Sequence, residues 1–196
     1  MLEAQDLSFA YPGAAPVLQH VSLSVQPGER VALSAPSGRG KTTLCQLLAG
    51  YLVPASGRVL LDGAPLPTRG ACPVQMIWQH PEKVLDPRLS LGRSLAQAGQ
   101  PSQRVIEALG IRPQWLARYP HELSGGELQR FCIARALGAN PRYLIADEIS
   151  TMLDAVTQAQ LWRFLLEEQQ RRGFGMLLVT HAPQLQELLA TRVVEL

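Results

Sequence analysis

The sequence contains few cysteines, no concentration of positive charge and no long hydrophobic run, and each absence excludes a class of protein. The three cysteines, Cys45, Cys72 and Cys132, lack CxxC or Cys/His metal spacing, so they predict neither a disulfide framework nor a zinc site. The 18 Lys and Arg residues are scattered and nearly balanced by 16 Asp and Glu residues, which disfavours nucleic-acid binding.

The apolar runs are also too short for a membrane. Met176–Val179 and similar runs have the length of a strand, far below the roughly 20 residues that a membrane helix needs. Residues 1–6 contain no basic region followed by an apolar stretch, so we expect no secretory signal. We therefore expect a cytoplasmic chain that depends on other chains wherever a membrane must be crossed.

The composition fits a single domain over residues 1–196, because 46% of the residues are hydrophobic and no repeat or low-complexity linker divides the chain. The first third alternates short β-like segments with Pro-Gly turns, the middle third is helical, and the last third alternates strands and helices. Within the helix at 154–172, Ala155, Ala159, Trp162 and Leu166 predict a stripe that faces the core. The expected strands are 5–11, 21–25, 30–34, 74–78, 142–146, 176–180 and 192–196, and the expected helices are 41–50, 90–98, 102–109, 126–137, 154–172 and 183–190.

Residues 35–42 match the phosphate-loop pattern G-x-x-x-x-G-K-[ST] at every fixed position except the first. Gly38 and Gly40 let the backbone curl so that successive N–H groups point at phosphate oxygens, and the following helix adds the positive end of its dipole. Lys41 supplies charge for the β- and γ-phosphates, and Thr42 offers a hydroxyl to Mg²⁺. A glycine-rich turn is the structural alternative. The expected nucleotide-binding residues here are Ala35, Pro36, Ser37, Gly38, Arg39, Gly40, Lys41, Thr42 and Thr43.

Ala35 occupies the first position of this pattern, where glycine is usual. Alanine is harmless at a negative φ and costs on the order of 1 kcal/mol or more at a positive one. We expect the negative φ, with the N–H of Ala35 still available to phosphate.

Two acids follow the continuous apolar run Tyr143–Ala146, which is typical of a buried parallel strand. Ligands collect at the carboxyl ends of such strands. We therefore expect Asp147 to face Mg²⁺ through water and Glu148 to polarise the water that attacks the γ-phosphate. Solvated loop acids are the alternative for an isolated Asp-Glu pair.

Two further polar residues end strands in the same way. His181 follows the strand at 176–180 and is expected to bond the γ-phosphate, or to hold the water and Glu148 in line. Gln79 ends the strand at 74–78, where its amide oxygen would meet Mg²⁺. The expected catalytic residues are Glu148, His181 and Lys41, and the expected metal-binding residues are Thr42, Gln79 and Asp147.

Residues 123–130, Leu-Ser-Gly-Gly-Glu-Leu-Gln-Arg, resemble the signature sequence of the ATP-binding subunits of ABC transporters, and the order of all the motifs is similar to that family over nearly the full length. Ser124 and the amides of Gly125 and Gly126 would form an anion site at a helix N-terminus; an ordinary capped helix is the alternative. The resemblance implies an α/β fold, namely a P-loop NTPase (RecA-like) core with a small antiparallel β flank and a helical signature-bearing subdomain at about 85–138.

The resemblance also implies how the site works and with which partners. The signature of one subunit would close over the γ-phosphate held by a second ATP-binding subunit, as a homo- or heterodimer, so that ATP and Mg²⁺ are enclosed between them. Tyr11 would stack on adenine, Gln79 would open the loop that contacts the membrane partner, and Asp154 would belong to a segment that signals between the sites. Two transmembrane permease subunits and an extracytoplasmic solute-binding protein are the implied partners, with the chain peripheral at the cytoplasmic face of the membrane.

Residues 77–90 are similar to the corresponding loop in the ATP-binding subunits of importers for oligopeptides, dipeptides and nickel. Residues 153–160 point to the same importers. Three departures from the family pattern stand beside this. Ile149 replaces the usual proline, Thr151 and Met152 replace a small Ser-Ala pair at the expected dimer contact, and the chain ends soon after His181 without the extension common in peptide importers. The second departure favours a non-identical partner.

The leading hypothesis is ATP hydrolysis coupled to import through separate membrane subunits. The main alternative is a soluble ABC ATPase that acts on DNA, ribosomes or another complex. A small-molecule kinase would have no use for residues 123–127. A cassette that binds nucleotide without hydrolysis is disfavoured by Glu148 and His181.

Overall fold

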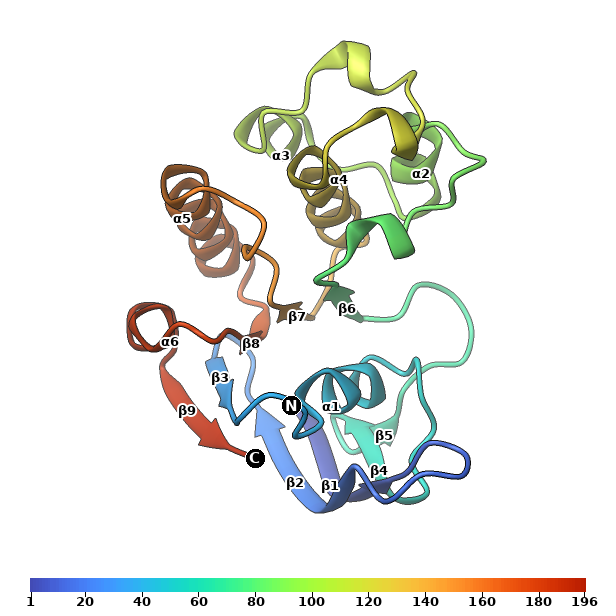
Figure 1. The fold of residues 1–196 in the computed structure, drawn as a ribbon, viewed down its shortest axis with the longest axis vertical. Helices are drawn as coiled ribbons and strands as arrows, with labels where there is room; N and C mark the ends of the chain where they lie inside the picture. The colour runs from blue at the N-terminus through green and yellow to red at the C-terminus, as the bar shows by residue number, and fades with distance from the viewer.

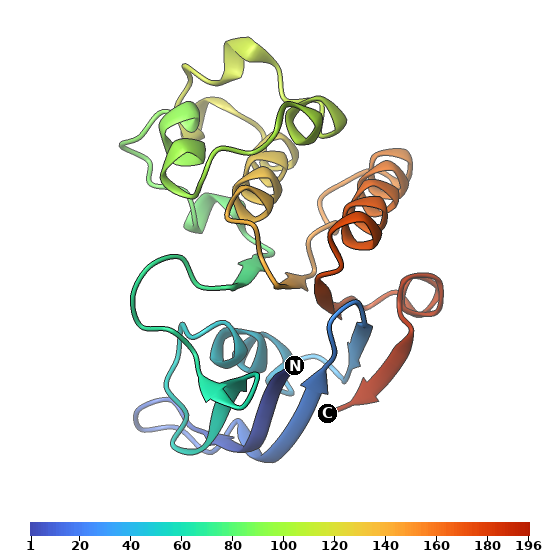
Figure 2. The same ribbon diagram turned by 180° about the vertical axis from the view of Figure 1, so that it is seen from behind.

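The computed structural model describes residues 1–196, which form two sheets and a group of helices that stands apart from them (Figures 1 and 2). The first sheet is antiparallel and has the order β2-β1-β4-β5. Asp6 has φ +53° and lies where the pairing of β1 with β2 shifts register, between Ala4 and Leu7. Before the shift the buried side chains are Leu2 and Ala4, and after it they are Leu7 and Phe9, so the inward-facing positions change from even to odd residue numbers. Its strands are β1 (Leu2–Phe9), β2 (Leu18–Val25), β4 (Ser56–Leu61) and β5 (Ala64–Pro65).

The second sheet is parallel and has the order β6-β7-β8-β3-β9. Its central strands β7 and β8 are buried at every position, as their unbroken apolar sequences predict for a strand covered on both faces. Its strands are β3 (Arg30–Ser34), β6 (Val74–Ile77), β7 (Tyr143–Asp147), β8 (Gly175–Val179) and β9 (Arg192–Glu195).

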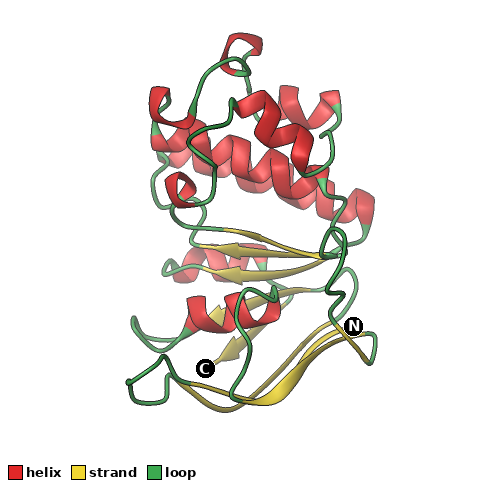
Figure 3. Ribbon diagram, turned by 90° about the vertical axis from the view of Figure 1, so that its right-hand side faces the viewer, coloured by secondary structure: helices red, strands yellow, loops and turns green.

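Two hydrophobic cores lie on the two faces of the parallel sheet, and together the elements form layers (Figure 3). Along β7, Tyr143 and Ile145 join the core that includes α1 (Lys41–Leu48) and the antiparallel sheet. Leu144 and Ala146 join the opposite core, which includes α4 (Gly125–Gly138), α5 (Ala155–Arg172) and α6 (Pro183–Leu189). Successive side chains of β7 therefore belong to opposite cores, so this one strand connects the two. No helix is both long enough and apolar enough to cross a membrane.

The helices that stand apart belong to the connection between β6 and β7. They are α2 (Leu91–Gln97), α3 (Gln103–Ala108) and α4, with 3₁₀ turns at Pro81–Lys83, Pro113–Trp115 and Pro120–Glu122. We call residues 81–138 the helical segment. Only four residues separate the end of α4 from the start of β7, so the C-terminus of α4 lies by the amino end of the sheet. The N-terminus of α4 lies roughly 21 Å along the helix from there.

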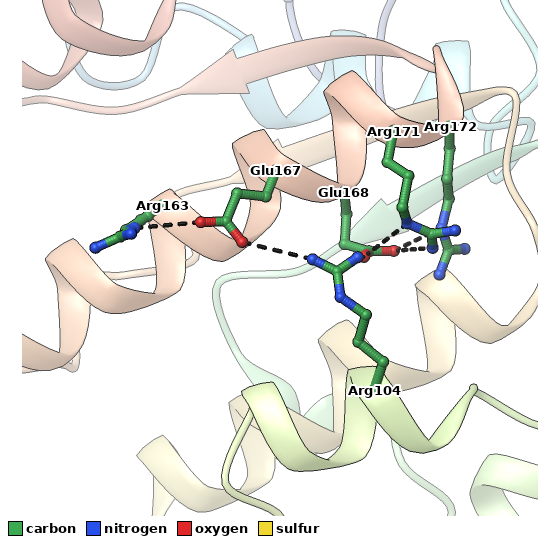
Figure 4. Close-up of polar contacts among 6 residues, drawn as sticks. All are labelled: Arg104, Arg163, Glu167, Glu168, Arg171 and Arg172. Carbon is green, nitrogen blue, oxygen red and sulfur yellow. Dashed lines mark hydrogen bonds and ion pairs between the residues drawn. The ribbon is translucent and has the colours of Figure 1, made fainter.

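The helical segment and α5 are joined by a network of charged side chains (Figure 4). The Glu168 carboxylate of α5 is fully buried, and it accepts hydrogen bonds from Arg104 of α3 and from Arg171 and Arg172 of α5 itself. Burial raises the pKa of Glu168, but the three guanidinium groups outweigh it, so the net pKa lies below its usual value. The carboxylate is therefore charged at neutral pH inside the fold.

The sequence predicted most elements within one or two residues, although β1 and β2 each begin three residues before the predicted start. It missed two strands, and one expectation, the stripe on α5, was wrong. Strands β4 and β5 were not predicted, because β4 begins with exposed residues and forms through pairing with β1, far away in the sequence. The stripe predicted on α5 does not face the core throughout, since Ala155 and Ala159 are exposed in an open groove between α5 and the short helix α6. The buried residues of α5 are Leu161, Trp162, Phe164, Leu165, Glu168 and Gln169.

Candidate active site

The loop between β3 and α1 requires glycine at two positions. Gly38 has φ +78° and Gly40 has φ +87°, a backbone region that side chains disfavour. A Cβ atom on Gly40 would also lie 2.8 Å from Cδ2 of Leu18 and 2.9 Å from Cγ1 of Val17. The positive φ angles give the curled backbone that the phosphate-loop pattern predicted. The structure adds that the loop packs closely against Val17 and Leu18 at the start of β2.

Ala35 has no positive φ, which confirms the conformation expected for it. Its carbonyl oxygen accepts a hydrogen bond from Nζ of Lys41 at 2.8 Å, and the carbonyl oxygen of Pro36 accepts another at 3.1 Å. The buried ammonium group is thus held by neutral oxygens of its own loop. An incoming phosphate would offer it a charged acceptor, which makes a stronger hydrogen bond.

An open pocket of about 500 Å³ collects residues from five separate parts of the chain. It brings together the phosphate loop, the aromatic residue before it and the polar residues that end β6, β7 and β8. Val17 is the lining residue that the sequence did not predict. No motif contains it, and only the structure shows that it packs against the loop at Gly40. The lining residues are Tyr11, Val17, Ser37, Gly38, Gly40, Lys41, Thr42, Thr43, Gln79, Glu148 and His181.

Tyr11 lies at one side of this pocket with 42% of its surface exposed. Its ring meets Phe9 edge-on, with centroids 5.0 Å apart, and its hydroxyl lies 3.3 Å from Oγ1 of Thr43. Phe9 and the first turn of α1 therefore hold the ring, and its exposed surface at the pocket can stack on a flat ligand.

Glu148 is held by three hydrogen-bonding contacts at the end of β7. Its backbone has φ +50°, rare for a residue with a side chain, and its N–H donates to the carbonyl of Val179 at 3.0 Å. Its carboxylate accepts from Nε2 of Gln79 at 2.9 Å and lies 2.7 Å from Nε2 of His181. An unusual backbone conformation so firmly fixed is typical of functional sites.

Asp147 is almost completely buried beside this carboxylate, with 1% of its surface exposed, and its Oδ1 atom has no hydrogen-bond partner. Burial raises the pKa of Asp147 above its usual range, with a further rise from Glu148, while Thr42 and Lys41 act in the opposite direction. A buried, unpaired carboxylate oxygen next to a threonine hydroxyl is a donor set that suits Mg²⁺. The residues present therefore fit a magnesium ion.

A second pocket, of about 540 Å³, lies on the other side of Thr42 and Gln79. These two residues line both pockets, so they form the wall between them. Gln129 of α4 donates to the carbonyl of Trp78 at 3.2 Å, which ties the helical segment to the same wall. The remaining lining residues are Gln46, Tyr51, Trp78, His80, Lys83, Val84, Arg135 and Asp147.

The residues at the start of α4 do not join either pocket. Ser124 is the N-cap of α4, and the two glycines after it pack on the loop before α5. A Cβ on Gly125 would lie 3.3 Å from Sδ of Met152, and one on Gly126 would lie 3.1 Å from Cδ2 of Leu153. Ala35, Pro36 and Arg39, which were expected to bind nucleotide, are also absent from the lining of the phosphate-loop pocket. The structure of one chain therefore does not unite the signature residues with the phosphate loop.

The residues near Glu148 that depart from the family pattern differ in their exposure to solvent. Ile149 is buried in the core and alters no surface. Met152 is 50% exposed beside Gly125, so its side chain does stand on the surface next to the signature. Asp154 accepts hydrogen bonds from the backbone N–H groups of Val156 and Thr157, and it thereby caps α5.

Comparison with known proteins identifies relatives over most of the chain. The ABC transporter family matches residues 18–151. The chain is 34% identical over 195 residues to the glutathione import ATP-binding protein GsiA of Salmonella typhimurium, covering 90% of this chain but only 31% of that protein. It is 36% identical over 201 residues to the nickel import ATP-binding protein NikE of Rhodospirillum rubrum, covering 92% and 72% respectively. The chain thus spans about a third of the glutathione import proteins that it matches.

Solved structures agree with this match. An ATP-binding subunit of an ABC transporter is 27% identical, with a TM-score of 0.87 over all of this chain and 85% of that one. A dimeric bacterial ABC transporter cassette is 25% identical, with a TM-score of 0.85 over all of this chain and 94% of that one. The predicted α/β fold with a P-loop NTPase core is confirmed.

Proposed function

This chain belongs to the ABC transporter family, and on that premise we propose that it binds and hydrolyses ATP to power transport of a small solute through separate membrane permease subunits. We propose that residues 1–196 are one nucleotide-binding domain, with a helical subdomain at about 85–138. The names of the relatives, which are import ATP-binding proteins for glutathione, peptides and nickel, support a solute of the peptide or nickel/metal chelate class.

The observation that carries the proposal is the position of Glu148. Its carboxylate is fixed between Gln79 and His181 at the rim of the pocket that also contains Lys41 and the phosphate loop. A carboxylate so fixed can accept a proton from a water molecule placed against the γ-phosphate, with His181 keeping it in orientation. Glu148, His181 and Lys41 are the proposed catalytic residues.

The binding roles follow the same geometry. The backbone N–H groups of Ala35 and of residues 37–43 would surround the phosphates, and Lys41 would leave its carbonyl partners for phosphate oxygens. The exposed ring of Tyr11 would stack on adenine. Thr42, Asp147 and the amide oxygen of Gln79 would hold Mg²⁺. When bound, Mg²⁺ neutralises charge on the phosphates.

The wall between the two pockets supports coupling to a membrane partner. Gln79 reaches Glu148 on one side and lines the second pocket on the other, so a protein segment in the second pocket would act on the proposed base through one side chain. We propose that the permease subunits bind there, which would make the chain peripheral at the cytoplasmic face of the membrane. An extracytoplasmic solute-binding protein would deliver the solute.

A second ATP-binding subunit follows from the separation of the signature from the phosphate loop. Ser124, Gly125 and Gly126 present the N-terminus of α4 without lining the pocket of their own chain. We propose that they contact the γ-phosphate of ATP in another subunit, an arrangement that the dimeric relative supports.

The proposal is tested by phosphate release from the purified chain and by recovery of its partners. Mg²⁺-dependent release should disappear in Lys41→Ala, while Glu148→Gln should retain ATP binding and lose release. In mild-detergent extracts of the native host, the tagged chain should bring down two multi-span proteins. Recovery from the soluble fraction with ribosomal or DNA-binding proteins would instead establish the soluble ATPase.

A further inference from the structure

The loop that follows Glu148 is attached to α5 by one buried hydroxyl group. Ser150 is only 5% exposed, and its Oγ atom accepts two hydrogen bonds from side chains of α5. Nε2 of Gln158 donates at 2.7 Å and Nε1 of Trp162 donates at 3.1 Å. A hydroxyl oxygen has two lone pairs, so these two donors occupy both of them. Ser150 is therefore the polar attachment of residues 149–153 to the helix that follows them.

This attachment lies two residues from the proposed base, whose backbone is in an uncommon conformation. Glu148 has φ +50°, which persists only where the surrounding contacts fix it. On the preceding side, its N–H donates to the carbonyl of Val179 at 3.0 Å. On the following side, its carbonyl accepts from the N–H and Oγ1 of Thr151, at 3.4 and 3.1 Å. Because Thr151 follows Ser150 directly, the bonds of Ser150 to α5 also fix the second side.

The same loop continues to the start of α4. The carbonyl of Ser150 accepts from the N–H of Leu153 at 3.2 Å, which closes the loop into a turn. Met152 then lies against Gly125, with its Sδ atom 3.3 Å from where a Cβ atom of that glycine would be. Leu153 lies against Gly126 in the same manner, at 3.1 Å. A single attachment to α5 therefore fixes a loop that has the proposed base at one end and the signature residues beside the other.

We propose that Ser150 is a positioning residue for ATP hydrolysis, which acts through Glu148 by holding the loop after it against α5. The inference rests on the proposed function, in which Glu148 is the base. The indole of Trp162 is 4% exposed and belongs to the hydrophobic core, so its N–H is a fixed donor. The rate of the chemical step should then depend on the Ser150 hydroxyl even where the stability of the fold does not.

Loss of the hydroxyl alone would have two effects that must be separated. Ser150→Ala detaches the loop, but it also leaves the buried N–H of Trp162 without an acceptor, which destabilises the fold. In a Trp162→Phe background that donor is absent, so Ser150→Ala no longer creates an unpaired buried group. The amide of Gln158 is half-buried and can bond to water instead. The comparison within this background therefore tests position without a change in stability.

The first measurement is steady-state ATP hydrolysis by the purified chain, together with its unfolding by urea. In the Trp162→Phe background, Ser150→Ala should lower kcat at least about tenfold, because about 1 Å of misplacement can cost up to about 10²-fold in rate. KM for ATP and the midpoint of urea unfolding should not change, since Ser150 does not line the phosphate-loop pocket. Ser150→Thr keeps the hydroxyl and should keep the kcat of the parent.

The chain offers a matched control in the antiparallel sheet. Oγ of Ser8 accepts a hydrogen bond from the N–H of His20 at 3.1 Å. Ser8→Ala therefore removes the same group from a loop attachment that is not connected to Glu148, and it should leave kcat unchanged.

The second measurement follows the loop without turnover. Amide hydrogen exchange of residues 148–153 should rise about tenfold when Ser150→Ala is added to Trp162→Phe, and it should not rise in Ser8→Ala. This readout does not depend on whether Glu148 is the base.

Equal kcat values with and without the Ser150 hydroxyl in the Trp162→Phe background would overturn the proposal. A fall in kcat accompanied by a lower urea midpoint would also overturn it, because the role would then be structural. Unchanged exchange in residues 148–153 would exclude the attachment of the loop. Hydrolysis by Glu148→Gln at the rate of the parent would refute the proposed base, whereas exchange would still decide whether Ser150 holds the loop.

Discussion

The backbone N–H and the hydroxyl of Ser124 both donate to a single oxygen of Glu127, Oε2, at 2.9 and 2.8 Å. These bonds, together with Arg112 and Arg118 nearby, hold the pKa of Glu127 below its usual value. The serine that would contact a phosphate is therefore already bound to a negative charge of its own helix.

Glu127→Gln should strengthen the action of the signature on ATP. Glutamine keeps the cap on α4, because Gln serves at this position as well as Glu, but it removes the charge that a phosphate would meet. The protein concentration at which ATP hydrolysis is half-maximal should fall at least about fivefold, or about 1 kcal/mol. Glu122→Gln is the control, since Glu122 caps the preceding turn in the same manner, and it should change nothing. Equal curves for both variants would contradict the prediction.

His181→Ala and Glu148→Gln should not have additive effects. The two side chains lie 2.7 Å apart and would act on one water molecule, so the second substitution removes little that the first has left. Glu148→Gln should lower kcat by roughly 10² to 10⁴, and the double variant should be no slower than that. Single-turnover hydrolysis of saturating ATP measures each rate. Multiplication of the two losses would show that the residues act independently.

Gly40→Ala should destabilise the fold more than Gly13→Ala. Both glycines have positive φ, which costs alanine on the order of 1 kcal/mol, but only Gly40 would also bring its Cβ against Val17 and Leu18. The difference should be at least about 1 kcal/mol in urea unfolding. Equal losses would indicate that the phosphate loop relaxes away from the antiparallel sheet.

Stability should decline as pH falls below the ordinary pKa of Glu168. Its folded pKa is lowered, so its contribution is complete above 4.5, the usual value, and is lost as pH falls through the lower folded value. Glu168→Gln should cost about 3 kcal/mol at pH 7, and this deficit should shrink in acid. Chemical unfolding of both proteins between pH 7 and pH 3 measures the difference. A deficit that is independent of pH would contradict the role given to the charge.

The sequence predicted the helices best where local chemistry defines their ends. Asp154 caps α5 with its carboxylate, and Gly173 ends the helix with φ +72°, so both boundaries are encoded within a few residues. The pairing of β4 with β1 and the exposure of Ala155 and Ala159 were missed because they depend on distant neighbours. Spacing along a helix marks a face, but only the tertiary structure determines what covers it.

The features of the candidate site likewise divide into those that the sequence predicted and those that only the structure shows. Gln79, Asp147, Glu148 and His181 were predicted together because parallel strands bring their carboxyl ends to one edge of a sheet. The amide of Gln79 was expected to serve a metal, and the structure adds that its nitrogen donates to Glu148. The left-handed backbone of Glu148 and the place of Val17 result from close packing that no motif records.

The position of β3 in the parallel sheet determines when the phosphate loop can form. Val31 pairs with Leu177 on one side and with Arg192 on the other, so both neighbours of β3 come from the last part of the chain. During synthesis, this strand emerges early and remains without partners until β8 and β9 have left the ribosome. We therefore expect the loop that follows β3 to acquire its fixed shape, and with it the capacity to bind nucleotide, only after β8 and β9 have paired with β3.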